Sequence, residues 1–275
     1  MPEGDTIFRA ARTLNKALAG KVVTRFETVL PHLERVHVDA PVTGRVVESV
    51  TSHGKWITMQ FSGDLILLTH MLMSGSWHIY RPGERWHRRH DDMRIVIATE
   101  SIEAIAFNVP IAEFHTTASL ARRPGFNRLG QDVLAAEFDE QVASQQLRSA
   151  PDLEVGEALL RQSLLAGIGN VFKSEIAFAC GVNPFRTVAT LKPEEATWLV
   201  RTARKYLLAN VSDTSNDKIV TYTGFRRTTG RANEEERLWV YGRAGQPCRK
   251  CGTPVRRLKQ GPDARVTFWC PSCQR

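Results

Sequence analysis

Two cysteine pairs near the carboxyl end, C-R-K-C at residues 248–251 and C-P-S-C at residues 270–273, decide how this region folds. Each C-x2-C pair can form a tight turn that points two sulfur atoms at one ion, and eighteen residues separate the pairs. This spacing is typical of a structural zinc site with four thiolate ligands. Disulfides are the alternative, but thiols stay reduced inside cells. We therefore expect one structural zinc ion, held by Cys248, Cys251, Cys270 and Cys273.

The same region carries the excess positive charge. The 275 residues include 37 Lys and Arg against 29 Asp and Glu, a formal net charge of +8. Residues 226–275 hold 12 basic and 4 acidic side chains, so the rest of the chain is balanced. A basic surface on one small module suits a polyanion such as nucleic acid. An anionic membrane surface and a solvated basic tail are the alternative interpretations.

Length and composition predict a folded protein of about two domains. With 42% hydrophobic and 24% charged residues the chain has ordinary globular composition, which excludes fibrous and wholly disordered classes. No apolar run approaches the ~20 residues that span a bilayer. The start M-P-E-G-D also lacks the charged and apolar regions of a secretion signal. We expect a soluble cytoplasmic protein with no membrane partner.

Short β-branched or aromatic segments follow an initial helix in the first half of the chain. That helix should be capped by Asp5 or Thr6 and stop at Gly20. About seven strands, separated by turn residues, predict an antiparallel sandwich or barrel. They are expected near residues 22–26, 45–50, 56–61, 65–69, 77–80, 94–98 and 102–107.

From about residue 130 the apolar residues recur at helical spacing. Helices are expected near residues 141–147, 157–165, 171–180 and 194–208, the last opened by Pro193. The change of period places the connection near residues 110–123. The predicted class is α+β: an N-terminal antiparallel β-sandwich with a leading helix, a helical domain and a β-hairpin zinc finger. We set their bounds at 1–115, 131–240 and 241–275, with a linker at 116–130.

Four segments resemble one enzyme family over the whole chain. They are M-P-E-G-D-T at 1–6, L-A-G-I-G-N-V-F-K-S-E-I at 165–176, V-Y-G-R-A-G-Q-P-C at 240–248 and R-V-T-F-W-C-P-S-C at 265–273. The chain is thereby similar to the Fpg/Nei family, formamidopyrimidine-DNA glycosylase and endonuclease VIII. These bifunctional enzymes excise oxidised bases in base excision repair and nick the abasic site. The resemblance implies a helix-two-turn-helix in the helical domain, and damaged DNA, duplex or single-stranded, as the partner of a nucleoid-associated monomer.

The resemblance assigns the chemistry to the first residues. Removal of Met1 would expose the secondary amine of Pro2, which is partly neutral near pH 7. Its attack on the sugar C1′ would displace the base and leave an iminium that promotes β- and then δ-elimination. Glu3 would move protons at the opening sugar. The chain departs from the family pattern M-P-E-x-P-E, because Thr6 replaces the second carboxylate, and Thr6 is not counted as catalytic.

Other residues match the positions with which the family holds DNA. Lys55, in S-H-G-K-W, and Arg265, on the zinc hairpin, would bind phosphates beside the lesion. Asn170 would open the second helix of the helix-two-turn-helix, where its amide and the helix N-terminus donate to phosphate. Met73 would fill the hole left by the flipped base. The expected catalytic set is Pro2, Glu3, Lys55 and Arg265, and the expected DNA-binding set is Met73, Asn170, Lys55 and Arg265.

A second loop separates the two branches of the family. The guanine-directed branch carries a segment resembling N-D-P-R-R-F, whereas residues 108–114 read N-V-P-I-A-E-F, without arginines. That difference, and Trp77 after S-G-S, favour the endonuclease VIII branch and oxidised pyrimidines. An 8-oxoguanine- or formamidopyrimidine-directed glycosylase is one alternative. A non-catalytic damage- or DNA-binding zinc-finger protein is the other.

Overall fold

The computed structural model describes residues 2–211, 221 and 238–275. Contacts divide the chain into two compact units, one of residues 1–2 and 6–128, the other of residues 3–5 and 129–275. Within the described ranges, no helix combines the length and the apolar character needed to cross a membrane.

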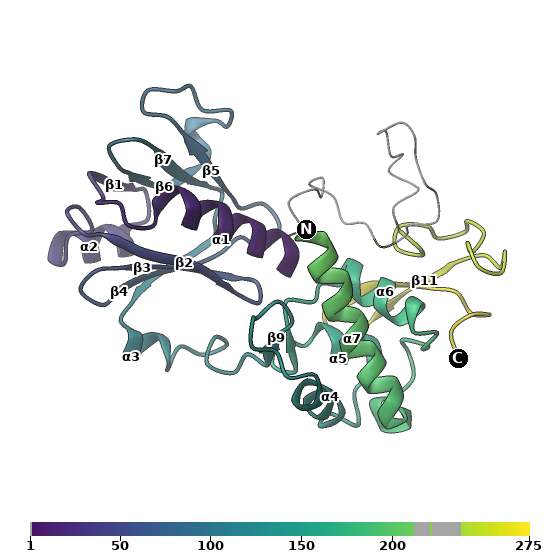
Figure 1. The fold of residues 1–275 in the computed structure, drawn as a ribbon. Coiled ribbons are helices and arrows are strands. Elements are labelled where there is room, and N and C mark those ends of the chain that lie inside the picture. Colours follow the sequence, from purple (N-terminus) through teal and green to yellow (C-terminus); the bar gives the residue numbers. More distant parts are fainter. Residues whose placement is uncertain (1, 212–220, 222–237) are drawn as a thin grey trace. The chain divides into compact units, whose positions relative to one another are not determined.

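The first unit is a sandwich of two four-stranded antiparallel sheets (Figure 1). The strand order is β1-β6-β7-β5 in one sheet and β2-β3-β4-β8 in the other. The strands are β1 (Arg25–Thr28), β2 (Val47–His53), β3 (Trp56–Phe61), β4 (Leu65–His70), β5 (Ser76–Tyr80), β6 (Met93–Ala98), β7 (Glu103–Phe107) and β8 (Ile111–His115). The sandwich predicted from the sequence is confirmed.

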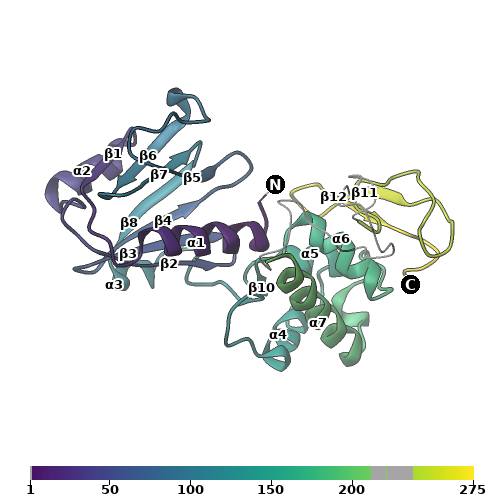
Figure 2. The same cartoon turned by 45° about the horizontal axis from the view of Figure 1, so that its top comes forward.

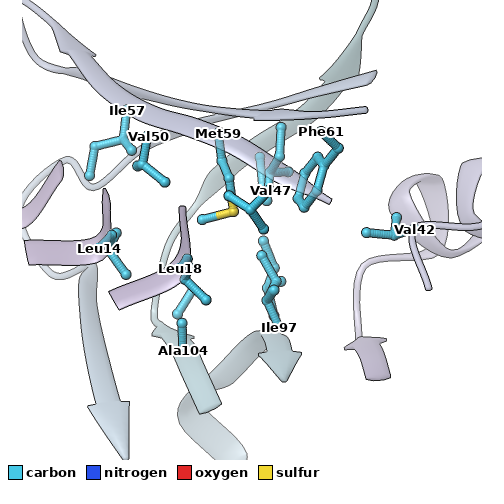
Figure 3. Packing of buried hydrophobic residues seen from close by; sticks show 14 of the residues in the cluster. Leu14, Leu18, Val42, Val47, Val50, Ile57, Met59, Phe61, Ile97 and Ala104 are labelled. Carbon is cyan, nitrogen blue, oxygen red and sulfur yellow. The ribbon is translucent and has the colours of Figure 1, made fainter. Parts of the chain in front are cut away.

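The core of this unit lies between the two sheets. Met59 and Phe61 come from one sheet and Ile97 from the other, while Leu14 and Leu18 come from α1 (Gly4–Leu18) (Figure 3). All five side chains are buried, and burying a side chain of this size stabilises the fold by about 1.5–3 kcal/mol. The apolar spacing of α1 therefore marks the face that packs into the sandwich.

Three details of the first unit differ from expectation. The first helix begins at Gly4, so Asp5 and Thr6 lie in its first turn and do not cap it. A helix, α2 (Pro31–Asp39), was not expected, because only Leu33 is buried and the apolar period is weak. Residues 111–115, where we expected the connection to begin, form β8 and pair with β4. A short helix, α3 (Thr117–Leu120), follows.

The second unit contains four α-helices of six or more residues among its described residues: α4 (Glu140–Arg148), α5 (Val155–Leu160), α6 (Asn170–Ala179) and α7 (Pro193–Asn210). Pro193 opens α7, as expected. A short parallel pair joins β9 (Gln131–Asp132) to β10 (Leu165–Ala166). The antiparallel hairpin of β11 (Arg256–Gln260) and β12 (Arg265–Trp269) packs on α6 (Figure 2).

Helix α6 is buried on almost every side. Its buried residues include Lys173 and Glu175 as well as apolar side chains. The Glu175 carboxylate accepts hydrogen bonds from the backbone N–H groups of Trp239 at 2.8 Å and Tyr241 at 2.8 Å, which fastens the segment that leads into the zinc finger. Buried charges of this kind require partners. Helix α6 is therefore the element on which the polar groups of the second unit converge.

Candidate active site and zinc site

The carboxylate of Glu3 lies on the N-terminus of α6. Its Oε1 accepts a hydrogen bond from the Val171 N–H at 2.8 Å, and its Oε2 accepts one from the Phe172 N–H at 3.2 Å. The Glu3 side chain is fully buried. A helix N-terminus offers unpaired N–H donors and a partial positive charge, which favour an ionised carboxylate. The Glu3 carboxylate is thus held in a fixed position by two backbone donors, one residue after Pro2.

Two glycines, Gly4 and Gly169, leave the space that this arrangement needs. The Gly4 N–H donates to the Gly167 carbonyl at 2.8 Å, and a Cβ added to Gly4 would lie 2.8 Å from Gly167 Cα. A Cβ added to Gly169 would overlap the carboxyl group of Glu3. Gly169 has extended backbone angles that any residue adopts, so space is what requires glycine there. The G-I-G segment at residues 167–169 and the N–H groups of Val171 and Phe172 therefore form the site that holds the Glu3 carboxylate, called here the seat of Glu3.

Asn170 begins α6, as the sequence predicts, but its amide serves the zinc hairpin. Its Nδ2 donates to the Val266 carbonyl on β12 at 2.9 Å. The side chain is buried, and its Oδ1 has no hydrogen-bond partner among the described residues. The expectation that the N-terminus of α6 is open to phosphate was wrong for two of its N–H groups, because both bind Glu3.

Arg265 is the first residue of β12 and is exposed, opposite Gln260 on β11. The buried side chain of Lys173 interacts electrostatically with both Arg265 and Glu3. Lys173 Nζ donates to Thr267 Oγ1 at 2.6 Å. Sequence reasoning missed Lys173, whose only signal is its place inside the segment N-V-F-K-S-E. The second unit thus brings Glu3, Lys173 and Arg265 together.

The four cysteine sulfurs form a zinc site. All four lie within 4.8 Å of one another, with Sγ to Sγ distances of 3.8 Å for Cys248 and Cys273 and 3.5 Å for Cys251 and Cys270. Tetrahedral zinc with bonds of about 2.3 Å separates its sulfur ligands by about 3.8 Å, so the site fits the ion. Four thiolates leave no open position for water. The zinc is structural and supplies no chemistry of its own.

In the first unit, Lys55 lies in the two-residue turn between β2 and β3, where Gly54 has a left-handed φ of 60°. His70 on the neighbouring β4 pairs with Trp56. Burial and the positive charges of Lys55 and Arg123 lower the pKa of His70 to about 4. His70 is therefore neutral near pH 7. Sequence reasoning missed His70, which stands three residues before Met73.

The segment after β4 turns Met73 away from the core. Met71 is buried, whereas Met73 is 67% exposed. Leu72 between them has a left-handed φ of 45°, a conformation that is uncommon for a branched side chain. The two methionines therefore do not share one environment. Lys55 and Met73 belong to the first unit, and Glu3, Asn170 and Arg265 to the second.

Three family profiles match successive parts of the chain. They are the formamidopyrimidine-DNA glycosylase N-terminal domain over residues 1–110, the formamidopyrimidine-DNA glycosylase H2TH domain over 129–220, and the zinc finger found in FPG and IleRS over 245–275. The chain belongs to the Fpg/Nei family. The resemblance inferred from the sequence motifs is thereby confirmed.

Similar family members span the full chain. "Probable endonuclease 8 2" of Streptomyces coelicolor is 41% identical and covers 100% of this chain and 94% of that protein. "DNA-(apurinic or apyrimidinic site) lyase Nei2" of Mycolicibacterium smegmatis is 36% identical over 100% of this chain and 99% of its own length. A solved structure of Lactococcus lactis Fpg, bound to DNA with an AP site, has a TM-score of 0.81 at 19% identity, with full coverage of both chains. This Fpg/Nei member therefore shares the Fpg fold.

Proposed function

We propose that this protein is a DNA glycosylase and abasic-site lyase that removes oxidised bases, oxidised pyrimidines above all, in base excision repair. The observation that carries the proposal is the seat of Glu3. The buried Glu3 carboxylate is fixed by the N–H groups of Val171 and Phe172. It directly follows Pro2, whose nitrogen becomes a secondary amine when Met1 is removed. This supports covalent catalysis by the chain terminus.

The steps follow from that arrangement. After removal of Met1, the lone pair of the Pro2 nitrogen attacks the sugar C1′, and the bond from C1′ to the damaged base breaks. The base leaves with a proton, and the nitrogen becomes an iminium as the sugar ring opens. Loss of a proton from C2′ then expels the 3′ phosphate, and a second elimination expels the 5′ phosphate. Glu3 accepts and returns the protons at the opening sugar.

Charged and apolar side chains on both units would hold the DNA. Arg265 and Lys55 bind phosphates beside the lesion. The guanidinium of Arg265 suits that role because it can donate two parallel hydrogen bonds to one phosphate. The exposed Met73 enters the base stack where the damaged nucleotide has left. Asn170 supports the hairpin by donating its amide to the Val266 carbonyl, and we propose that it contributes to phosphate binding by holding the hairpin in place.

The preference for oxidised pyrimidines is supported by the segment at residues 108–114. Val109 is fully buried, and the ring of Phe114 packs on Phe26 with centroids 5.7 Å apart. Glu113 is bound by Arg123 at 2.9 Å. These side chains are used inside the first unit and offer no arginine to read the base opposite the lesion. The names of similar relatives, endonuclease 8, agree with this branch.

We also propose that the protein acts in the cytoplasm, on the DNA of the nucleoid. Four thiolate ligands persist where cysteines stay reduced, which supports a cytoplasmic location. The concentrated basic charge of residues 226–275 supports association with DNA.

A single-turnover excision panel tests the function. Oxidised pyrimidines, 8-oxoguanine and a formamidopyrimidine are placed opposite each of the four bases and in single strands, and the cleaved ends are separated on a gel. We expect oxidised pyrimidines to react fastest and the products to carry phosphate at both ends. Faster release of 8-oxoguanine would favour the guanine-directed alternative. Binding without any excision would favour the non-catalytic alternative, and Glu3→Gln is the inactive control.

A further inference from the structure

Lys173 is a fully buried lysine one turn into α6. Its relative exposure is 0%, whereas lysine is almost never fully buried unless it is paired. Its Nζ donates to Thr267 Oγ1 on β12 at 2.6 Å. A buried ammonium is costly, so its retention in the interior calls for a specific role.

The hydrogen bond to Thr267 begins a buried polar chain. Thr267 Oγ1 donates to Gln260 Oε1 at 2.6 Å, across the two strands of the zinc hairpin. Gln260 Nε2 donates to Glu154 Oε2 and to the Pro184 carbonyl, both at 2.8 Å. The Thr267 hydroxyl and both hydrogens of the Gln260 amide have acceptors in this network, which fixes its geometry. Lys173 is thereby tied to the hairpin that carries Arg265.

Three charged groups act on Lys173 from the elements around it. Burial lowers the pKa of Lys173 to about 8, the negative charge of Glu3 opposes that shift, Arg265 adds to it, and Glu157 on α5 opposes it. The ammonium is therefore mostly charged at pH 7 and mostly neutral above pH 9. A phosphate bound to Arg265 would offset that residue's charge and favour the charged lysine.

We propose that Lys173 is a positioning residue of this reaction, whose buried ammonium keeps the Glu3 carboxylate charged and couples it to the zinc hairpin beside Arg265. The inference rests on the proposed function. The N–H groups at the start of α6 and the positive charge of Lys173 both favour the charged form of Glu3. Lys173 is also bonded to Thr267 on the hairpin that carries Arg265. A phosphate bound by Arg265 therefore favours the charged lysine, and the charged lysine favours the ionised Glu3 carboxylate. Because Lys173 is fully buried, its Nζ is not placed to act as the nucleophile.

Single-turnover cleavage of an abasic-site duplex, measured from pH 5 to pH 9.5, tests this role with Lys173→Met and Lys173→Arg. Without the positive charge the neutral carboxyl is favoured, so the acidic limb of the Lys173→Met profile moves to higher pH. Its rate at pH 7 falls roughly tenfold, below the 10²–10⁴-fold that a positioned acid–base group supplies. Lys173→Arg keeps the acidic limb, and its rate relative to wild type rises above pH 8, where the native lysine loses its charge.

Zinc content and affinity for undamaged duplex show whether the variants fold. If Lys173→Met loses zinc, Thr267→Val replaces it: the missing hydroxyl weakens the tie to the hairpin, and a smaller shift in the same direction is expected. A profile in the folded variant that keeps its shape, whether unchanged or lowered equally at every pH, overturns the inference. Wild-type protein that cleaves no abasic strand would instead contradict the proposed function.

Discussion

The Glu3 carboxylate accepts a hydrogen bond from the backbone N–H of Val171 at 2.8 Å, across 168 residues of sequence. The third residue of the chain is therefore fixed by a helix of the second unit. The same helix donates the Asn170 amide to Val266 on the zinc hairpin. The carboxylate proposed to move protons and the hairpin proposed to hold phosphate thus depend on one helix.

Gly169→Ala tests the seat of Glu3. A Cβ at this position would overlap the Glu3 carboxyl group, so the carboxylate must leave the N–H groups of Val171 and Phe172. We expect strand cleavage to fall by about a hundredfold, the lower range for a positioned acid–base group. Zinc content should be unchanged, because the added methyl group faces Glu3 and not the cysteines.

Gly83→Ala is the matched control. Gly83 lies in an exposed turn with nothing within 4 Å of an added Cβ, and its φ of 78° makes the substitution cost about 1–2 kcal/mol of local strain. Cleavage by this variant should stay near wild type. Equal activity of the Gly169→Ala and Gly83→Ala proteins would show that the seat of Glu3 is not needed.

Cys251→Ser should remove the zinc and with it the affinity for DNA. Three thiolates hold the ion far more weakly than four, and the hairpin residue Phe268 packs in one cluster with Cys248 and Cys270. The core of the first unit shares no residue with that cluster, so its strand signal in circular dichroism should persist. Metal analysis and fluorescence anisotropy measure the two losses. Full DNA binding by zinc-free protein would contradict this assignment.

Arg265→Ala should weaken binding to lesion-bearing and undamaged duplexes alike. Each neutralised phosphate contributes about 0.9 to the slope of log affinity against log salt, so the slope should flatten by roughly one unit. Asn170→Ala removes the bond to Val266 but no charge, and should weaken binding with little change of slope. A salt titration of both variants decides. An unaltered slope in Arg265→Ala would place the hairpin away from the DNA.

Glu113→Gln tests a half-buried ionic contact of the first unit, between Glu113 and Arg123. Hydrogen bonds from Arg123, and further from His115, lower the pKa of Glu113 to about 2 from 4.5. Because the folded pKa lies below the unfolded value, the contact stabilises the fold above pH 4.5 and is lost as pH falls toward 2. The free energy of unfolding of the variant should be about 1 kcal/mol lower than that of the wild type at pH 7. This difference between the two proteins should shrink at pH 3.5.

Asp91→Asn serves as the control for that comparison. Asp91 pairs with Arg89, and both side chains are 81% exposed, so its removal should leave the unfolding free energy unchanged within about 0.5 kcal/mol. Urea unfolding of all three proteins at both pH values provides the measurement. A Glu113→Gln difference that grew on acidification would have the wrong sign for this contact.

Sequence alone predicts the features whose chemistry lies in local spacing. The cysteine pairs predict the zinc site, and alternating apolar residues predict most strands of the sandwich. The seat of Glu3 depends on a contact across 168 residues, which no local pattern reveals. Lys173 escaped notice because α6 is buried on nearly every side, so helical periodicity cannot tell a buried lysine from an exposed one.

Borohydride trapping on an abasic-site oligonucleotide tests the central claim most directly. Protein with Met1 removed should form a covalent adduct with DNA, and mass spectrometry should place the link on Pro2. The same protein with an uncleaved N-terminal extension should retain zinc and DNA affinity yet form almost no adduct, because its Pro2 nitrogen is an amide. Trapping by the extended protein at the wild-type level would contradict the account and assign the nucleophile to an internal lysine.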